Sequence, residues 1–535
     1  MARSDWYARV RELTRQLVAW GSVTGTEGER EFAFRLRDLL GGLPYFAAHP
    51  DLLLLRRTLD DPLERHTLFA LVRGQGPKTV ILTGHYDAVS VENYGPLRPW
   101  AFDPEGLLPR LLEEVRASDP LAAKDLASGD FLPGRAALDM KSGLAAGMAV
   151  LERFSTEPQR AGNLLFMAVP DEEGSSQGMR SAVRQLPERL EAWGLEVAAA
   201  INLDAHVDPG DGSKGQRVFL GSVGKLLPTV FFVGAPTHAA DPYSGVGANF
   251  LAAELIRLLE ANPDFADGEA PPPVNLRQGD FKDHYDVTTP HTAFAAFNLL
   301  THTWGPEQVL QRVLAATRQA MTAALETLGE RAKTRGVRSP HRPPRVLTLA
   351  ELEQRVRTEA GSVEEAYREI PASDTLEFSR QVTANLLRLA GLEGPAAVVG
   401  FGSLYYPPVR LGESPKEARL LEAVSRQAQA VSREFGTPIG LGPFFPGISD
   451  MSFLGGHDTL GALEAMAANT PAFGQTLHFD YSLPGRLQIP VVNIGPWGRD
   501  YHQRTERVYM PYSFGVLPEL LWRVCGDLLG RAPCV

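Results

Sequence analysis

Short apolar runs alternate with amphipathic segments through the first part of the chain. In the N-terminal segment and in residues 144–154, apolar positions recur every three or four residues, which is typical of a helix with one buried face. Aliphatic runs bounded by glycine or polar residues are typical of buried strands. Such runs occupy residues 66–72, 79–82, 163–169 and 198–203. The alternation predicts an α/β layer structure.

Glycine and proline lie between the first two predicted strands. Residues 74–77 read Gly-Gln-Gly-Pro and separate the apolar runs 66–72 and 79–82. A glycine-containing connection of this length commonly joins two neighbouring strands. The pattern therefore favours a strand–turn–strand unit over residues 66–82.

A second region begins near residue 215. A strand is predicted at 226–233 and a helix after Ala248, and prolines then interrupt the chain at 271–273 and within 331–345. Two helix starts follow. Ser362 and Glu365 form a capping-box pattern, and Asp374 can cap a helix that ends before Gly391.

The extended sequence SLYYPP at 403–408 ends this region, because the residue before a proline avoids helical geometry. The chain then returns to helices, loops and a strand at 491–494. The pattern therefore divides the chain into three regions, residues 1–214, 215–402 and 403–535.

Composition narrows the class of protein. The chain has 44% hydrophobic and 22% charged residues, as ordinary globular proteins do. Its net charge of −11 argues against nucleic acid or an anionic membrane as the main partner. No apolar run is long enough to span a membrane, and the charged N-terminal segment lacks the apolar core of a signal peptide. These features predict a cytoplasmic protein.

Only two cysteines are present, Cys525 and Cys534. So few in so long a chain argue against a disulfide framework, fit a reducing compartment, and exclude a zinc site built from several thiolates. Any metal must therefore be held by histidine, aspartate and glutamate.

Such side chains follow several of the apolar runs. They occur in TGHYDAV (83–89), GRAALDMKSG (134–143), PDEEGSS (170–176), INLDAH (201–206) and at His502, with Glu506 four residues later. Each cluster alone has an ordinary structural explanation: a capped strand end, a helix cap at Asp139, or solvated surface glutamates. Together they supply histidines and carboxylates for a metal site.

The spacing within two clusters suggests a division of roles. Asp87 lies two residues after His85 and can hold the second ring nitrogen of that histidine if the chain bends there. Glu172 and Glu173 are adjacent after a predicted strand, so one can bind metal while the other accepts a proton from water. In INLDAH, both Asp204 and His206 are candidate ligands.

The ordered set GHxD, GRxxxDMK, EEG, Asp and a late His near Gly-Pro resembles the co-catalytic zinc metallopeptidases and deacylases. That family includes acetylornithine deacetylase, succinyl-diaminopimelate desuccinylase, aminoacylase and glutamate carboxypeptidase. Trp100 and Asp103-Pro104 also fit its segment after the first motif. The chain length and the long gap between His85 and Asp139 look most like the arginine-utilisation hydrolase (RocB) branch.

The resemblance implies that residues 1–214 and 403–535 form a zinc-peptidase-like catalytic domain, with a mixed central sheet flanked by helices. It implies that residues 215–402 form an inserted α+β lid or dimerisation domain. It implies that two zinc ions, replaceable by cobalt or manganese, share the bridging ligand Asp139. Asp87 would orient His85, Glu172 would be the general base, and the peptide after Asp139 would be cis. The implied metal ligands are His85, Asp139 and Asp204 for one ion, and Asp139, Glu173 and His502 for the other.

In the inserted domain, His238 matches the family's lid histidine, which steadies the oxyanion, and Asn249 lies near its helix-start asparagine. The arginine that often binds a substrate carboxylate is absent from FNLLTH at 297–302, and Arg499 is a candidate substitute. The length of the domain is compatible with a homodimer that exchanges His238 and with a monomer whose enlarged lid covers its own site.

The function these features imply is hydrolysis of an amide bond in a small amino-acid-derived substrate, by water that the metals activate. An N-acyl amino acid or an arginine-pathway intermediate is the expected substrate, with a dipeptidase or carboxypeptidase as the alternative. A non-catalytic metal-binding protein on the same fold is a second alternative. A dinucleotide-dependent enzyme is disfavoured because SGVGANF (244–250) lacks the complete GxGxxG motif.

Overall fold

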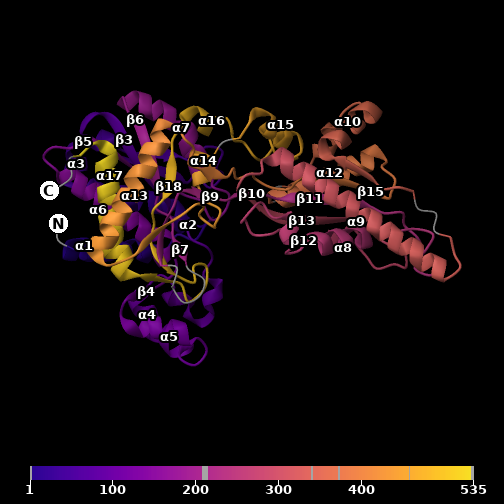
Figure 1. Ribbon diagram of the computed structural model, residues 1–535, viewed down its shortest axis with the longest axis horizontal. Helices are drawn as coiled ribbons and strands as arrows, with labels where there is room; N and C mark the ends of the chain where they lie inside the picture. The colour runs from indigo at the N-terminus through magenta and orange to yellow at the C-terminus, as the bar shows by residue number, and fades with distance from the viewer. Residues whose placement is uncertain (1–2, 208–214, 339–341, 372–373, 457, 532–535) are drawn as a thin grey trace. The chain divides into compact units, whose positions relative to one another are not determined.

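The computed structural model describes residues 3–207, 215–338, 342–371, 374–456 and 458–531. The predicted domain boundary at residue 214 and Cys534 lie outside these residues. Contacts divide the described chain into two compact units (Figure 1). The first comprises residues 3–222, 409–456 and 483–531, and the second comprises 223–408 and 458–482.

The first unit is built on an eight-stranded mixed sheet with the strand order β1-β2-β5-β3-β6-β18-β8-β17. β3 runs parallel to both β5 and β6, and β6 runs parallel to β18, whereas β1, β2 and β5 are successively antiparallel. The strands are Leu53–Arg57 (β1), His66–Val72 (β2), Gln75–His85 (β3), Ala161–Val169 (β5), Glu196–Asn202 (β6), Gln216–Phe219 (β8), Ile439–Gly442 (β17) and Val491–Asn493 (β18).

Helices cover both faces of this sheet. The helix α6 connects β3 back to β5, and α7 connects β5 across to β6 in the opposite direction along the sheet. Because parallel crossovers are right-handed, α6 and α7 lie on opposite faces. The main helices are Arg3–Ala19 (α1), Glu27–Gly41 (α2), Ser142–Thr156 (α6), Gln177–Trp193 (α7), Pro415–Phe435 (α13) and Leu517–Leu529 (α17).

Both strands of the predicted strand–turn–strand unit form, but they are not paired with each other. Residues 66–72 form β2 as expected, but β2 does not pair with β3, because β5 lies between them. Residues 164–169 of β5 are buried without interruption. A strand that is apolar on both faces is stable in the interior of a covered sheet, and β5 therefore lies between two other strands. The Gly-Gln-Gly-Pro connection therefore leads into β3 rather than closing a two-stranded hairpin.

Two smaller assemblies complete the first unit. A four-stranded sheet has the order β4-β20-β19-β7, formed by Phe131–Pro133, Arg507–Tyr509, Trp497–Arg499 and His206–Val207. A helical segment between β3 and β4 contains η2 (Glu92–Trp100), α4 (Pro104–Val115) and α5 (Pro120–Ser128) and buries its own small apolar cluster, including Leu107 and Leu111.

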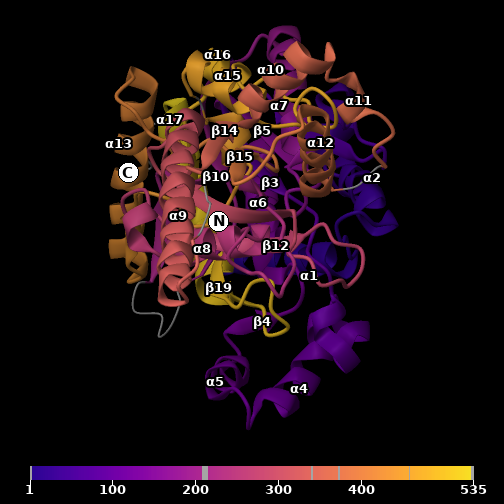
Figure 2. The ribbon, with the colours of Figure 1, turned by 90° about the vertical axis from the view of Figure 1, so that its right-hand side faces the viewer.

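The second unit contains a six-stranded sheet in the order β10-β13-β11-β15-β14, with β12 pairing β13 at an edge. Helices α8 and α9 pack on each other and against β11, and α9 is the long helix labelled in Figure 2. The strands are Gly224–Leu226 (β10), Pro228–Val233 (β11), Val274–Asp280 (β12), Thr292–Thr301 (β13), Arg345–Thr348 (β14) and Ala396–Phe401 (β15). The helices are Ala248–Leu259 (α8), Pro306–Thr334 (α9), Leu349–Ala360 (α10) and Thr375–Ala390 (α12).

Helix caps in the second unit agree with the sequence at one position and differ at another. The Asp374 side chain accepts a hydrogen bond from the Glu377 N–H and caps α12, which ends at Ala390, just before Gly391, as predicted. The capping box predicted from Ser362 and Glu365 was wrong, because the helix there is only Glu364–Tyr367 and begins after Val363. Ser362 accepts the Glu364 N–H instead.

The unit boundaries differ from the predicted domain boundaries: the second unit spans 223–408 rather than 215–402, and it also includes residues 458–482. Residues 216–219 form β8, which pairs with β17 and β18 in the first unit's sheet, so the second unit begins at residue 223. Residues 460–468 form α15, which packs on α9, and residues 458–482 therefore belong to the second unit. Both segments were assigned by position along the chain, which carries no information about their distant partners.

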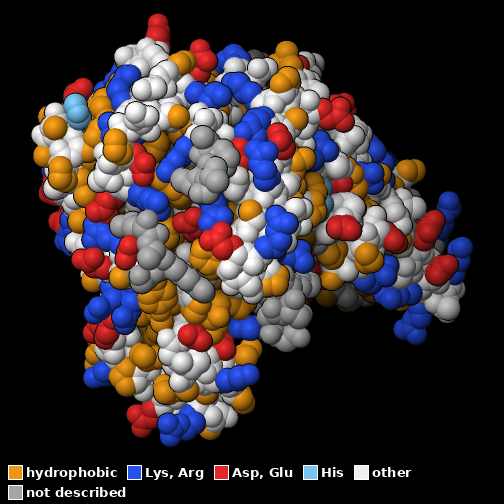
Figure 3. All heavy atoms as spheres, turned by 60° about the vertical axis from the view of Figure 1, so that its left-hand side comes forward, with side chains coloured by type: hydrophobic (Ala, Val, Ile, Leu, Met, Phe, Trp, Pro, Cys, Tyr) orange, Lys and Arg blue, Asp and Glu red, His pale blue; other side chains and the backbone are white. Residues whose placement is uncertain are grey.

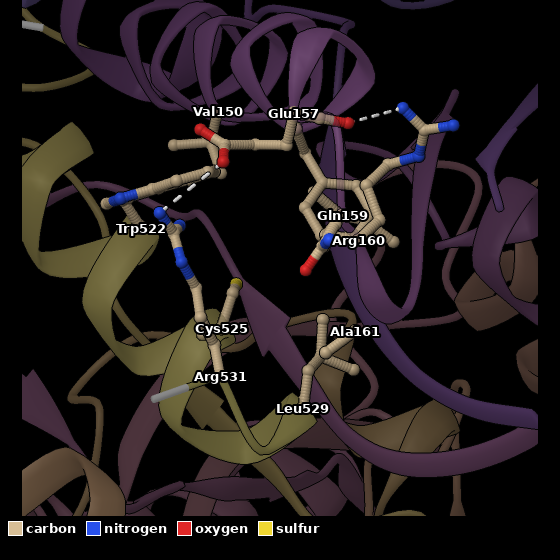
Figure 4. A pocket seen from close by; sticks show the side chains of 12 residues that line it. Val150, Glu157, Gln159, Arg160, Ala161, Trp522, Cys525, Leu529 and Arg531 are labelled. Atoms are coloured by element: carbon tan, nitrogen blue, oxygen red, sulfur yellow. Dashed lines mark hydrogen bonds and ion pairs between the residues drawn. The ribbon is translucent and has the colours of Figure 1, made fainter. Parts of the chain in front are cut away.

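A small pocket opens in the first unit at the end of the sheet where β5 begins (Figure 4). Its walls come from the last turn of α6, the start of β5 and α17, and include Trp522 and buried Cys525. The Arg531 guanidinium lies 4.2 Å from a Trp522 ring centroid and 3.6 Å from the Glu157 carboxylate. This end is opposite the one where β3 ends at His85.

The surface mixes both signs of charge. Figure 3 shows acidic and basic side chains interspersed over the visible face. Oppositely charged side chains such as those of Arg9 and Glu152 form ion pairs. None of the helices in the described part of the chain combines the length and the apolar character that crossing a bilayer requires.

Candidate metal centre

Three parallel strands end beside one another and carry polar side chains at that edge. His85 is the last residue of β3, Glu172 and Glu173 follow β5, and Asp204 follows β6. Because parallel strands align their carboxyl ends, side chains beyond those ends share one edge of the sheet, which is where α/β proteins commonly bind ligands. The apolar strands therefore determine where this polar cluster forms.

Asp139 and His502 reach the same place from other elements. Asp139 lies in η3 (Ala137–Lys141) just before α6, and the Asp139–Met140 peptide bond is cis, as the family resemblance implied. His502 lies in the loop between β19 and β20. Asp139 Oδ1 is 3.2 Å from His85 Nε2, and Asp139 Oδ2 is 3.2 Å from His502 Nε2. Asp139 thus stands between the two imidazoles.

The remaining carboxylates surround this core. Glu173 Oε1 is 3.1 Å from His502 Nε2. Asp204 Oδ1 and Glu172 Oε2 are 3.8 and 3.9 Å from His85 Nε2. These side chains form three overlapping groups whose ligand atoms lie within 4.8 Å of one another: His85, Asp139 and Asp204; Asp139, Glu173 and His502; and His85, Glu172 and Glu173.

Asp87 lies behind His85 and is completely buried. The His85 Nδ1 atom is 3.2 Å from the Asp87 carbonyl oxygen and 3.4 Å from its Oδ1, so the chain does bend after β3. The Asp87 carboxylate also accepts the backbone N–H groups of Glu172 and Glu173, each at 3.1 Å. Asp87 therefore orients the imidazole and positions the loop that carries both glutamates.

Asp204 is held through its backbone by Asn493, the last residue of β18. Asn493 Oδ1 accepts the Asp204 N–H at 3.0 Å, and Asn493 Nδ2 donates to the Asp204 carbonyl at 2.8 Å. A side chain at the nearby Gly495 would lie 1.9 Å from that carbonyl oxygen, so glycine is required there. The sequence contained no local signal for the role of Asn493, because it depends on β18 lying beside β6.

The structure places the two candidate ligands, Asp204 and His206, in different surroundings. His206 lies between the rings of Phe219 and Tyr512, with ring centroids at 5.5 and 6.4 Å. Its Nε2 accepts the Arg217 N–H at 3.1 Å, and burial lowers its pKa to about 3. Among the described residues, the groups of candidate ligands contain Asp204 and not His206.

Substitution of these two residues is expected to have different effects. We expect His206→Gln to destabilise the packing of the two aromatic rings but to keep bound metal at the wild-type level. We expect Asp204→Asn to weaken metal binding by roughly 10-fold or more, since a charged ligand is lost. Metal analysis after dialysis checks both variants. If His206→Gln lost metal and Asp204→Asn kept it, the histidine would be identified as the ligand.

Buried carboxyl groups outnumber the imidazoles in this cluster, and the pKa values of both kinds of group are shifted. Burial raises the pKa of Glu172, Glu173 and Asp204 above their ordinary values. Burial opposes a charged imidazole, but hydrogen bonds to carboxylates raise the pKa of His85 well above its usual value and that of His502 to about 10. Clustered oxygen and imidazole ligands with excess negative charge fit divalent cations such as zinc.

One further buried carboxylate near the cluster was missed at the sequence level. Asp450 is 2% exposed, and burial together with the charges of Asp87 and Asp204 raises its pKa to about 7. It precedes the short helix Met451–Leu454 and follows none of the apolar runs that predicted the other site residues. Its proximity arises from the packing of that helix on α7 and β18.

The residues predicted in the second unit and at Arg499 lie in other settings. His238 is exposed, and its Nδ1 accepts the Ala240 N–H at 3.0 Å, so its role in steadying an oxyanion stays a prediction. Asn249 Nδ2 donates to Asp280. Arg499 is buried, with its Nε 3.1 Å from Asp125 Oδ2, so the carboxylate-binding role considered for it is not supported.

Comparison with known proteins identifies the family. A family model of Peptidase family M20/M25/M40 matches residues 81–473, a span that contains His85, Asp139, Glu173 and Asp204. The chain is 36% identical to protein YqjN of Bacillus subtilis (strain 168) over 540 residues, covering 97% of this chain and 96% of that protein. It is 30% identical to protein RocB of the same strain over 539 residues, covering 97% and 95%.

Among solved structures, a tripeptidase from Staphylococcus aureus aligns with a TM-score of 0.52 at 15% identity, covering 98% of this chain and 99% of that chain. This likeness concerns the fold alone. Since the family model spans more than half of the chain and both relatives match nearly all of it, the chain belongs to peptidase family M20/M25/M40, a family of hydrolases.

Proposed function

We propose that this protein hydrolyses an amide bond of a small amino-acid-derived substrate with the help of two divalent metal ions, with zinc as the expected metal. The observation that carries the proposal is the position of Asp139, whose two carboxylate oxygens each lie 3.2 Å from a different imidazole. One carboxylate placed between two histidines is the arrangement that a bridging ligand requires.

The ligand sets follow from the contacts. His85, Asp139 and Asp204 would hold one ion, and Asp139, Glu173 and His502 would hold the other. Each set combines one imidazole nitrogen with carboxylate oxygens, which suits zinc and also permits cobalt or manganese. When bound, such a metal pair supplies Lewis-acid chemistry that lowers the pKa of a water molecule and polarises a substrate carbonyl.

Glu172 is the residue best placed to move a proton. Its Oε2 is 3.9 Å from His85 Nε2, whereas its neighbour Glu173 makes a 3.1 Å contact with His502. The side chain of Glu172 is 11% exposed, so water can reach it, and the Asp87 carboxylate fixes its backbone. Glu172 would accept a proton from the attacking water and pass it to the leaving amine.

For the substrate we favour an N-acyl amino acid or an arginine-pathway intermediate, and a dipeptide or the C-terminal residue of a peptide is the alternative. The resemblance to the arginine-utilisation branch in chain length and motif spacing supports the first choice. The absence of an arginine in 297–302 does not separate the two, because an N-acyl amino acid and a dipeptide both carry a free carboxylate. Arg499, the candidate replacement, already forms an ion pair with Asp125 in the first unit.

Metal removal tests the proposed function. We expect the purified protein to hydrolyse at least one member of a panel of N-acyl amino acids and dipeptides. Treatment with a chelator followed by dialysis is expected to abolish turnover, and addition of zinc, cobalt or manganese is expected to restore it. Initial rates and bound metal per chain are measured on the same samples.

Two outcomes would contradict the proposal. Turnover that persists in protein shown to be metal-free would exclude metal-dependent hydrolysis. Protein that binds two ions but hydrolyses no member of the panel, and no other amide, would favour the alternative of a non-catalytic metal-binding protein on the same fold.

A further inference from the structure

We infer that Arg135 and Glu506, together with Asn93, are positioning residues that hold Asp139 and His502 in place for the second metal ion. The inference rests on the proposed function. It adds residues that touch neither metal nor substrate but determine where two of the ligands stand. All of them lie in the first unit.

Glu506 fastens the segment that carries Asp139. Its side chain is 1% exposed, and its Oε1 accepts the backbone N–H groups of Leu138 and Asp139 at 3.3 and 3.4 Å. Its Oε2 accepts the Arg135 Nη1 hydrogen at 2.6 Å. Glu506 lies just before β20, at the end of the loop that contains His502, so it links Asp139 to that loop.

The Arg135 guanidinium donates hydrogen bonds to four residues from other parts of the first unit. Besides Glu506, its Nη2 donates to Asn93 Oδ1 at 2.9 Å, to the Ser90 carbonyl at 3.2 Å and to the His502 carbonyl at 3.3 Å. The planar guanidinium presents several donors in fixed directions, which a lysine cannot reproduce. Arg135 therefore acts as the common point of the network.

His502 needs this support because its backbone is in an uncommon conformation. Its φ is +64°, in the left-handed region that non-glycine residues adopt at a cost and usually only when surrounding contacts impose it. Two donors hold its carbonyl oxygen, Asn93 Nδ2 at 2.8 Å and Arg135 Nη2 at 3.3 Å. That conformation directs the His502 imidazole to Asp139 and Glu173.

The network serves one side of the cluster more than the other. Its contacts reach the backbones of Asp139 and His502, which are ligands of the same proposed ion, while His85 is held separately by Asp87. Loss of the network should therefore weaken the ion bound by His502 more than the ion bound by His85. This asymmetry distinguishes a positioning role from a general contribution to folding.

Equilibrium dialysis of the metal-free protein against zinc alone tests the inference. The variants are Asn93→Ala, Arg135→Lys, Arg135→Met and Glu506→Gln. Asn93 is exposed, so its truncation leaves no buried charge without a partner. The control is Leu520→Ala, which removes a fully buried side chain from α17, a helix that supplies no residue to the cluster. Thermal unfolding is followed for every variant without metal.

We expect wild-type protein and Leu520→Ala to bind two zinc ions per chain. We expect Arg135→Met and Glu506→Gln to lose roughly 10–100-fold in affinity for one ion and little for the other, with Asn93→Ala near the lower end of that range. Arg135→Lys should fall between wild type and Arg135→Met. With cobalt in place of zinc, the absorption bands should change for one ion only.

The inference is overturned if Asn93→Ala and Glu506→Gln bind both zinc ions as tightly as wild type. It is also overturned if Leu520→Ala loses affinity to the same extent, since the loss would then follow stability. If Arg135→Met does not fold, the zinc affinity of Asn93→Ala tests the inference in its place. Wild-type protein that binds fewer than two zinc ions would instead refute the dinuclear proposal itself, and with it this inference.

Discussion

Replacement of Glu172 by glutamine is expected to lower kcat roughly 10²–10⁴-fold while bound metal remains at the wild-type level. The amide of glutamine is close in size and keeps an oxygen, so the loop held by the Asp87 carboxylate should not move. It cannot accept a proton from water at neutral pH. The proposed ligand sets do not need the Glu172 carboxylate, because Glu173 makes the contact with His502.

Steady-state kinetics and metal analysis of the same preparation check this expectation. A matched control is Glu196→Gln, which removes an exposed carboxylate at the start of β6, the end of that strand remote from Asp204. The control should keep both kcat and KM. Unchanged kcat in Glu172→Gln would remove Glu172 as the base, and loss of metal from that variant would show that it is a ligand.

Replacement of Asp139 by asparagine is expected to have the largest effect on metal binding. Asp139 is the only carboxylate among the described residues that contacts both His85 Nε2 and His502 Nε2 at 3.2 Å. Asparagine offers one oxygen and no charge, so it cannot serve both ions. We expect the affinity for both metal ions to fall by roughly 100-fold or more, which exceeds the usual effect of losing a residue that only supports a ligand. Turnover should disappear when the metal ions are lost.

This expectation is checked by zinc content after dialysis and by turnover in excess zinc. Asp38→Asn provides the control, because Asp38 is an exposed aspartate on α2 whose side chain is 69% accessible. Retention of two tightly bound ions in Asp139→Asn would contradict the bridging role. Loss of only one ion would show that Asp139 serves a single metal and would require a different ligand set.

Elements with strong local patterns were predicted well. The strand at 66–72, the helix at 144–154 and the strand at 163–169 all appear near the expected residues, because uninterrupted apolar runs and helical periodicity reflect burial directly. The Asp374 cap was also correct, since a cap depends on neighbours three residues apart. The apolar run at 226–233 instead gave two strands, interrupted at Leu227, the residue before Pro228.

Local signals did not determine which distant segments pair or pack together. The Gly-Gln-Gly-Pro connection is compatible with a hairpin, and only the insertion of β5 between β2 and β3 excludes one. The segment 458–482 carries no mark of belonging to the second unit, and its assignment comes from the contact of α15 with α9. Pairings of this kind depend on the whole set of strands and helices available to the chain.

For the site, the sequence by itself determined which side chains are available and that several of them follow buried strands. The resemblance of their order to that of a known family implied His85, Asp139, Glu173, Asp204 and His502 as a group, whereas the residues alone left Asp204 and His206 as alternatives. Only the tertiary structure decided that Asp139 stands between two imidazoles, that His206 packs against aromatic rings, and that Arg135 meets Glu506. The physical reason is that chemistry and periodicity are local properties of the chain, whereas distances between residues hundreds of positions apart are set by strand order and packing.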